Sequence, residues 1–104
     1  MEKYKIQLSI KAKEDLKNIV RYVKYELLEP LIAQKYAELI KNEIKTLEHM
    51  PQKFAVIDTN IVKYDNFRKL IIKNYIAFYR INEEEKIVNI ERILYGSTDW
   101  KNKL

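Results

Sequence analysis

Near the end of the chain, apolar and polar residues alternate with the period of two that is typical of β-strands. The alternating stretches are residues 67–72, 75–81 and 87–95. Lys73 and Asn74 form a two-residue turn signal after the first stretch, and the charged residues 82–86 form a second turn. Gly96, the only glycine of the chain, ends the third stretch and is predicted to adopt a backbone conformation that other residues resist. The pattern predicts an antiparallel meander of three strands.

A fourth alternating stretch opens the chain at residues 4–10. In a strand with this register, Ile6, Leu8 and Ile10 share one face. We expect this strand to join the later meander, which gives a sheet of four strands.

Between the first strand and the meander, apolar residues recur at the spacing of amphipathic helices. The first helix is predicted to begin after Ser9, which can cap it, and to run for about four to five turns. Glu29-Pro30 interrupts the pattern, and its proline suits the first turn of a second helix. That helix must end near residues 49–50, because Pro51 disfavours helical geometry in the residue before it. The two apolar stripes are Ala12, Leu16, Ile19, Val20, Val23 and Leu27, and Ala33, Tyr36, Ala37, Ile40, Ile44 and Leu47.

These elements predict an α+β fold in which an antiparallel two-helix hairpin lies across one face of a four-stranded sheet. The chain has 104 residues, so we expect one domain that spans residues 1–104. Residues 52–65 are interpreted as an ordered loop. Ser97 can cap a short C-terminal turn or helix, from which Trp100 folds back on the body.

Neither face of the predicted meander is clearly polar, so both faces need to be covered. The helices can cover only one of them. The other is predicted to be a partner-binding surface, unless loops and Trp100 cover it. The alternation predicts that one face of the meander carries Arg68, Leu70, Ile72, Ile76, Phe78, Arg80, Val88, Ile90, Arg92 and Leu94.

Composition narrows the class of protein. The chain is 47% hydrophobic and 34% charged, which excludes a disordered tail and a membrane span. It has no cysteine and no apolar signal region at its start, so we expect a cytoplasmic protein without disulfides. The net charge of +5 favours an anionic partner, either nucleic acid or an acidic protein segment. No cofactor or metal site is predicted, because the one histidine, His49, has no evident partner.

Several segments, taken in order, resemble the RelE/ParE toxins of bacterial type II toxin–antitoxin modules. The resemblance spans nearly the whole chain, and the ordered set is more specific than any of its pieces. The matching segments are residues 9–16 and 47–51 at the two ends of the helical region, and residues 67–70, 74–81 and 92–100.

The resemblance implies one of two toxic mechanisms, because some members cleave messenger RNA in the ribosome while ParE members poison DNA gyrase. A ribosome-dependent nuclease needs cationic and proton-transferring groups at the scissile phosphate. Arg68 matches one such position, and Tyr95 stands where many ParE-like members carry a histidine. Ile76 and Thr98, however, stand where the nucleases carry arginines. We therefore interpret the chain as ParE-like, a growth inhibitor of the plasmid-stabilisation type.

Two alternatives to a gyrase poison stay open at this stage. One is a metal-independent messenger RNA endonuclease with Arg68 and Tyr95 as catalytic residues, assisted by Arg80 or Arg92. The other is a non-toxic member that only binds its antitoxin.

The resemblance also implies a cognate acidic antitoxin. We expect a segment of this antitoxin, disordered alone, to fold onto the uncovered face of the sheet. Its apolar side chains would lie over Leu70, Phe78 and Ile90, and its carboxylates near Arg68, Arg80 and Arg92.

Overall fold

The computed structural model describes residues 3–54, 56–57 and 66–98. The predicted order of elements is confirmed, and the bounds of the three meander strands agree with the prediction to within one residue. The elements are β1 (Lys5–Leu8), α1 (Ile10–Arg21), a π-helical turn (Tyr22–Glu26), α2 (Pro30–Lys45), 3₁₀ turns at Thr46–Glu48 and Pro51–Lys53, β2 (Arg68–Ile72), β3 (Tyr75–Asn82) and β4 (Ile87–Tyr95).

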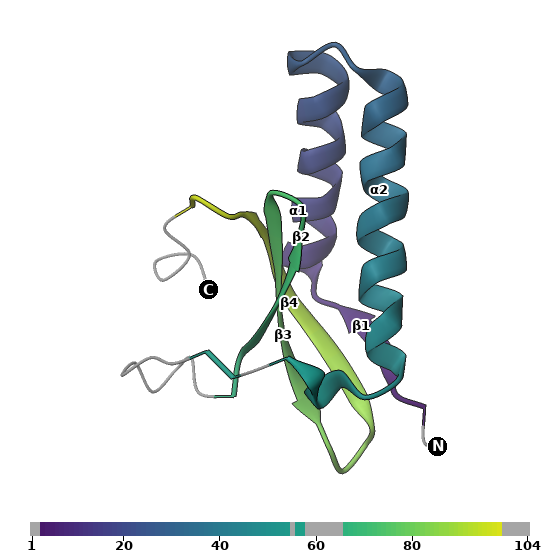
Figure 1. Ribbon diagram of the computed structural model, residues 1–104, viewed down its shortest axis with the longest axis vertical. Coiled ribbons are helices and arrows are strands. Elements are labelled where there is room, and N and C mark those ends of the chain that lie inside the picture. The colour runs from purple at the N-terminus through teal and green to yellow at the C-terminus, as the bar shows by residue number, and fades with distance from the viewer. Residues whose placement is uncertain (1–2, 55, 58–65, 99–104) are drawn as a thin grey trace.

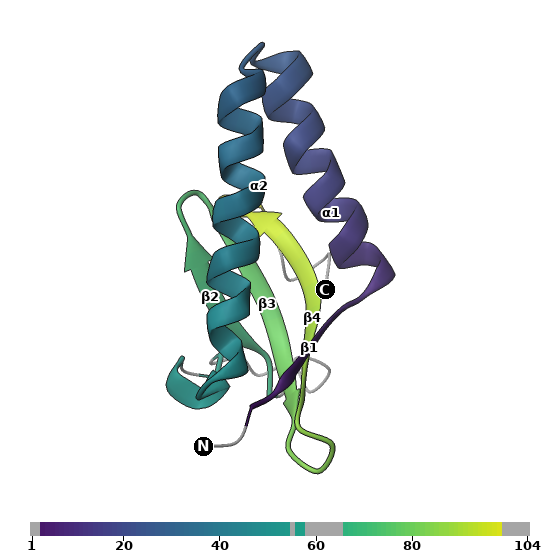
Figure 2. The ribbon, with the colours of Figure 1, turned by 90° about the vertical axis from the view of Figure 1, so that its right-hand side faces the viewer.

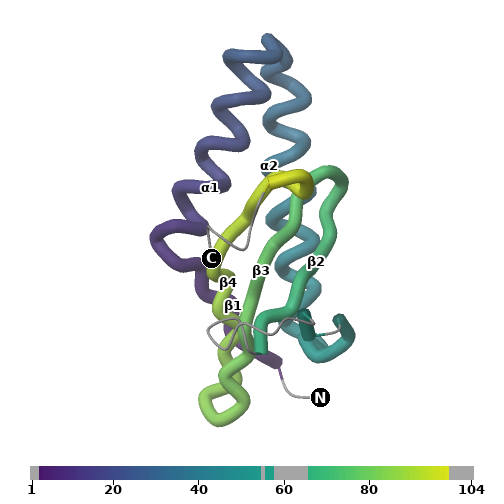
Figure 3. Tube along the Cα trace, turned by 90° about the vertical axis from the view of Figure 1, so that its left-hand side faces the viewer, coloured from purple at the N-terminus to yellow at the C-terminus, as the bar shows by residue number. Residues whose placement is uncertain are grey.

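The four strands form one mixed sheet in the order β1-β4-β3-β2. β1 runs parallel to β4 and pairs with it from Lys5↔Ile87 to Leu8↔Ile90, while β2, β3 and β4 form the antiparallel meander. Figures 1 and 2 show α2 lying across one face of the sheet and α1 running beside β4. Figure 3 shows the sheet from the side opposite the helices. β1 pairs only with the first half of β4, and α1 lies beside the second half.

The first helix begins where the sequence predicts. The side chain of Ser9 accepts a hydrogen bond from the backbone N–H of Ala12 and donates one to the carbonyl of Glu91. This cap ties the start of α1 to β4 as well as satisfying a free N–H group. The helix ends in the π-helical turn, after which Leu28 adopts a left-handed φ of 54°. Ile10, predicted to share a strand face with Ile6 and Leu8, instead starts the helix and is exposed.

The second helix starts with Pro30 in its first turn and ends in a 3₁₀ turn just before residues 49–50, as predicted. The predicted stripes of both helices are buried or partly buried, except that Leu27 at the tip of the hairpin is half exposed. Figures 1 and 2 show the connecting end of the hairpin projecting beyond the sheet. The sheet therefore covers one end of the hairpin and leaves its tip open.

The main core lies between the helices and one face of the sheet. A smaller cluster of Phe67, Phe78 and Leu94 lies on the other face, with Ile57 and Ile76 packed against it. The buried residues of the main core are Tyr4, Ala12, Ile19, Ile40, Ile44, Leu47, Leu70, Ile72, Ala77, Tyr79, Val88, Ile90 and Ile93.

This division contradicts the predicted set of positions on one face. The set placed Phe78 with Leu70 and Ile90, but Phe78 lies on the opposite face of the sheet. The reason is the register: a two-residue turn sets Ile72 opposite Tyr75, so Leu70 faces the same way as Ala77 and not as Phe78. A bulge between Phe78 and Tyr79 shifts the pairing with β4 by one further residue.

Gly96 does not have the predicted left-handed backbone. Positive φ values occur instead at other residues. Among them are Lys73, in the turn between β2 and β3, and Lys86, at the end of the turn between β3 and β4. At Gly96 the constraint is space, because a Cβ there would lie 3.2 Å from the carbonyl oxygen of Asn74, to which the Gly96 N–H donates at 2.7 Å. Val56, in the segment interpreted as a loop, forms an isolated antiparallel bridge with Arg68. Trp100 lies outside the described residues.

The phenol of Tyr79 is fully buried and donates a hydrogen bond to the carbonyl of Pro51 at 2.7 Å. Burial raises the pKa of Tyr79 to about 12, although the nearby charge of Arg68 opposes this rise. In the unfolded chain this pKa is about 10, so between roughly pH 10 and 12 the unfolded state loses the proton that the folded state keeps. We expect the free energy of unfolding to fall by about 2–3 kcal/mol over this interval.

Urea unfolding at a series of alkaline pH values measures this loss. Tyr79→Phe is the matched control, because it keeps the ring and removes the titrating group. The mutant should be less stable near neutral pH by about 1 kcal/mol and should lose less stability between pH 10 and 12. Equal alkaline losses in both proteins would contradict the assignment to Tyr79.

Candidate functional site

Arg68, the first candidate catalytic residue, lies at the start of β2 on the face covered by the helices. Its Nη1 donates hydrogen bonds to the backbone carbonyls of Gln52, at 3.1 Å, and Phe54. These carbonyls belong to the segment that follows the helical hairpin, so Arg68 fastens this segment to the sheet.

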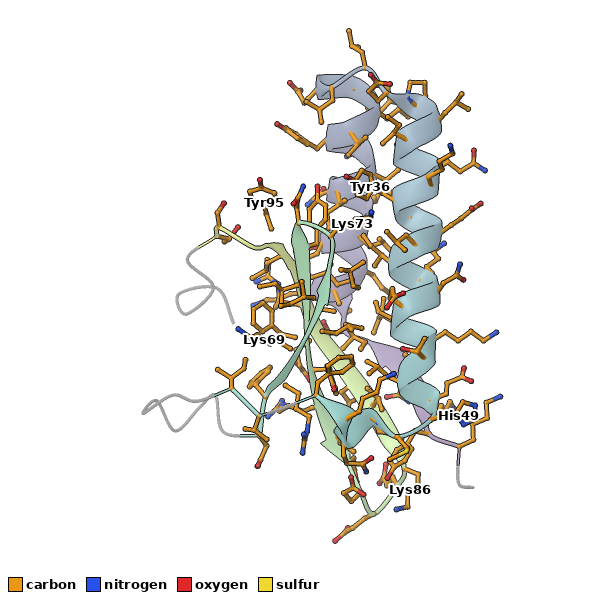
Figure 4. The ribbon with its side chains drawn as sticks, viewed as in Figure 1. Tyr36, His49, Lys69, Lys73, Lys86 and Tyr95 are labelled. Carbon is orange, nitrogen blue, oxygen red and sulfur yellow. The ribbon has the colours of Figure 1, made fainter. Side chains whose placement is uncertain are left out.

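Tyr95, the second candidate, lies at the opposite end of the meander and is half exposed. Its ring packs edge-on against Tyr75, which packs edge-on against Tyr36. Burial, followed by the neighbouring phenols of Tyr36 and Tyr95, raises the pKa of Tyr75 above its ordinary value. Figure 4 shows Tyr36 and Tyr95 near the upper end of the sheet and His49 toward its lower end.

The strand register gives the separation of the two candidates. Arg68 pairs with Tyr79 of β3, and Tyr95 pairs with Tyr75 of the same strand. Four residues of a strand span about 13 Å. Arg68 and Tyr95 also stand on different strands, with β3 between them. Because the guanidinium of Arg68 is held at the carbonyls of Gln52 and Phe54, the two side chains do not converge on one site in this structure.

Arg92 is held by the first helix. Its Nε and Nη2 donate to the two carboxylate oxygens of Asp15 at 2.7 and 2.9 Å, and the Ile93 N–H donates to the same carboxylate at 2.9 Å. Only 17% and 11% of the Arg92 and Asp15 side chains are exposed. The hydrogen bonds from Arg92 to Asp15 are also the main reason that the pKa of Arg92 is raised. Asp15 therefore fastens α1 along the edge of β4 that β1 leaves unpaired.

Arg80 lies on the face away from the helices and is exposed. Its guanidinium lies 4.9 Å from the ring centroid of Phe67, and its Nη2 is 3.4 Å from Glu91 Oε1. The three candidate arginines therefore contact different partners and do not form one cationic cluster.

Of the three apolar residues predicted to meet an antitoxin, none is accessible. Leu70 and Ile90 are buried beneath the helices, and Phe78 is buried in the small cluster on the other face. The prediction that they share an open face is wrong for the reason of register given above.

The structure shows an apolar groove that the sequence did not predict. It has a volume of about 560 Å³ and lies where the helical hairpin meets the ends of β3 and β4. Exposed apolar residues continue from it to the tip of the hairpin, namely Tyr25, Leu28 and Leu31. One feature of the sequence could have indicated this apolar surface, namely the large apolar residues near Pro30 that lie off the two stripes. The groove is lined by Asp15, Asn18, Ile19, Tyr22, Val23, Leu27, Tyr36, Asn74, Tyr75, Ile93, Leu94 and Tyr95.

The described residues contain no group of three or more His, Asp or Glu side chains that could hold a metal ion. Within the same part of the chain, no helix is long and apolar enough to cross a membrane.

A family model described as the ParE toxin of the type II toxin–antitoxin system, parDE, matches residues 6–100. The chain belongs to this ParE toxin family. The resemblance noted in the sequence is thereby confirmed, including its ParE branch. None of the curated proteins matches the sequence of this ParE-family chain.

Solved structures of toxin–antitoxin systems share the fold of this ParE toxin. The chain is similar to one from the chromosomal ParDE system of P. aeruginosa, with a TM-score of 0.72, 22% identity, and coverage of 88% of this chain and 95% of that one. It is also similar to a chain of the RelBE2 complex from Mycobacterium tuberculosis, with a TM-score of 0.66, 19% identity and coverage of 91% and 93%. A third is the archaeal RelE-RelB complex from Pyrococcus horikoshii OT3, with a TM-score of 0.60, 14% identity and coverage of 91% and 97%.

Proposed function

We propose that this ParE toxin arrests growth by acting on DNA gyrase. Gyrase is favoured over the ribosome as the target because Arg68 is separated from Tyr95 and its guanidinium is bound by two backbone carbonyls. A ribosome-dependent nuclease needs its charged and proton-transferring groups within reach of one phosphate. A protein that acts by binding gyrase has no such requirement.

Purified toxin added to DNA gyrase and supercoiled plasmid should produce gyrase-linked breaks, seen as linear DNA after the enzyme is denatured. In parallel, messenger RNA on translating ribosomes should stay uncut when probed by primer extension. Codon-dependent cleavage without any effect on gyrase would contradict the proposal. If neither substrate responds and expression leaves growth unchanged, the chain is a non-toxic member of the family.

We further propose that a cognate acidic antitoxin neutralises the toxin by covering the apolar groove and the adjoining tip of the hairpin. The solved complexes with the same fold, RelBE2 and RelE-RelB, support the existence of a partner. The groove is favoured over the open face of the sheet because Tyr22, Leu27 and Tyr95 of its lining are exposed, whereas Phe67 and Phe78 on the open face are buried.

Charge inserted into the groove should weaken the complex. Leu27 and Tyr95 are 52% and 51% exposed and both line the groove, so Leu27→Glu or Tyr95→Glu should leave the toxin folded. We expect each to raise the Kd for the antitoxin by about tenfold or more, as for a residue at the centre of an interface. Isothermal titration calorimetry with the antitoxin encoded beside the toxin gene provides the measurement.

Ile71→Glu is the matched control, because Ile71 is an equally exposed apolar residue that lies on β2 and outside the groove. It should leave the Kd nearly unchanged. The reverse result, a loss at Ile71 and none at Leu27 or Tyr95, would place the antitoxin on the open face of the sheet.

A further inference from the structure

The outward face of α1 carries a row of cations that neither the fold nor the groove uses. Lys13, Lys17, Arg21 and Lys24 follow one another at intervals of four, four and three residues, and all four are exposed. Residues at these intervals lie on one face of a helix, so the charges repeat about every 6 Å along α1 and the turn that follows it. Figure 2 shows α1 at the margin of the molecule beside β4, with no other described element outside it.

The row is not neutralised by neighbouring carboxylates. Among the described residues, no ion pair joins any of its four members to an acidic side chain. Asp15 faces the sheet, where it binds Arg92, and Lys24 lies over the ring of Tyr25 at 5.2 Å. Four like charges along one helix repel one another by small amounts, and exposed Glu14, three residues before Lys17, forms no ion pair with them among the described residues.

The surroundings of the row indicate the chemistry of a ligand. Between Lys13 and Arg21 the helix exposes no large apolar side chain, and the exposed Ile10, Tyr22 and Tyr25 lie only at the two ends of the row. An acidic amphipathic peptide or a membrane surface would need such side chains as anchors. A phosphodiester backbone needs none, since its binding is mainly electrostatic and one strand carries a charge every 3.4 Å of helix axis.

We propose that the outward face of α1 binds the phosphodiester backbone of a nucleic acid, independently of base sequence. The row supplies up to four phosphate contacts, two of them from the second half of α1 at Lys17 and Arg21. Lys13, Lys17 and Arg21 do not line the groove assigned to the antitoxin, whereas Lys24 lies beside Tyr25 at the adjoining tip of the hairpin.

Fluorescence anisotropy with the purified toxin and labelled duplexes of random sequence tests the proposal, with duplex DNA in one arm and duplex RNA in the other. No gyrase or antitoxin is present, so the result is separate from that of the proposed function. We expect binding that weakens with salt, with a slope of log K against log salt of roughly −3 to −4 for four contacts. Binding of one duplex type only would assign the backbone as DNA or RNA.

The decisive variant is the double charge reversal Lys17→Glu with Arg21→Glu. It should lower the affinity by more than about tenfold at low salt and reduce the salt slope by roughly two. Lys69→Glu with Lys73→Glu is the matched control, because it changes the net charge equally. Lys69 lies on β2 and Lys73 in the turn that follows it, and neither belongs to α1 (Figure 4). This control should keep the slope of the wild type. Circular dichroism melting of both variants checks that they are folded.

Three results would overturn the proposal. The first is an absence of binding to both duplexes at low salt. The second is an equal loss in the β2 control, which would mean that net charge alone drives the association. The third is binding to an acidic peptide, polyglutamate, with no binding to either duplex, which would assign the row to a protein partner.

Discussion

Replacing Asp15 with alanine is expected to lower the free energy of unfolding by about 3–5 kcal/mol, the range for removing one partner of a buried ion pair. The carboxylate of Asp15 accepts three hydrogen bonds, two from Arg92 and one from the backbone N–H of Ile93. Its loss would leave a largely buried guanidinium without its counter-ion and a strand-edge N–H without an acceptor.

Asp15→Asn is the informative companion to this mutant. The amide keeps the shape and one acceptor oxygen but removes the charge, so its loss should be smaller than that of Asp15→Ala. Lys13→Ala, on the exposed face of the same helix, should change the stability by less than about 0.5 kcal/mol. Chemical denaturation followed by circular dichroism compares the three. A loss below about 1 kcal/mol for Asp15→Ala would mean that the ion pair does not fasten α1 to β4.

The second large effect is expected at Ile40, which is fully buried between α2 and the sheet. Ile40→Ala should cost about 2–5 kcal/mol, through lost transfer free energy and the cavity left behind. Leu31→Ala provides the comparison, because Leu31 lies on the same helix but is 74% exposed. It should be nearly neutral for stability. Similar losses at both positions would show that helix propensity, and not packing, determines the effect.

The predicted fold was recoverable because its signals are local. The meander strands alternate with period two, and the two helices carry apolar stripes interrupted at Pro30 and ended before Pro51. The cap at Ser9 follows from the same local chemistry. These features depend on residues a few positions apart, so periodicity alone locates them.

The candidate site was less predictable because it depends on which residues meet across the sheet. Phe78 was assigned to the wrong face, since its parity relative to Leu70 depends on the length of one turn and its pairing with β4 on one bulge. A one-residue change in either reverses the face. The arginines illustrate the same point, because Arg68, Arg80 and Arg92 look alike in the sequence and make three different contacts.

The sequence by itself determined the order of elements, the extents of the helices and of the meander strands, and membership of a toxin family, because all three are written in local patterns and ordered motifs. Only the tertiary structure decided which face the helices cover, that Asp15 rather than a partner protein engages Arg92, and that Tyr95 lies far from Arg68. It also revealed the apolar groove, whose lining comes from segments that lie up to 80 residues apart in the chain, from Asp15 to Tyr95. The physical reason is that burial and ion pairing depend on distances between segments, which strand register and helix docking set together.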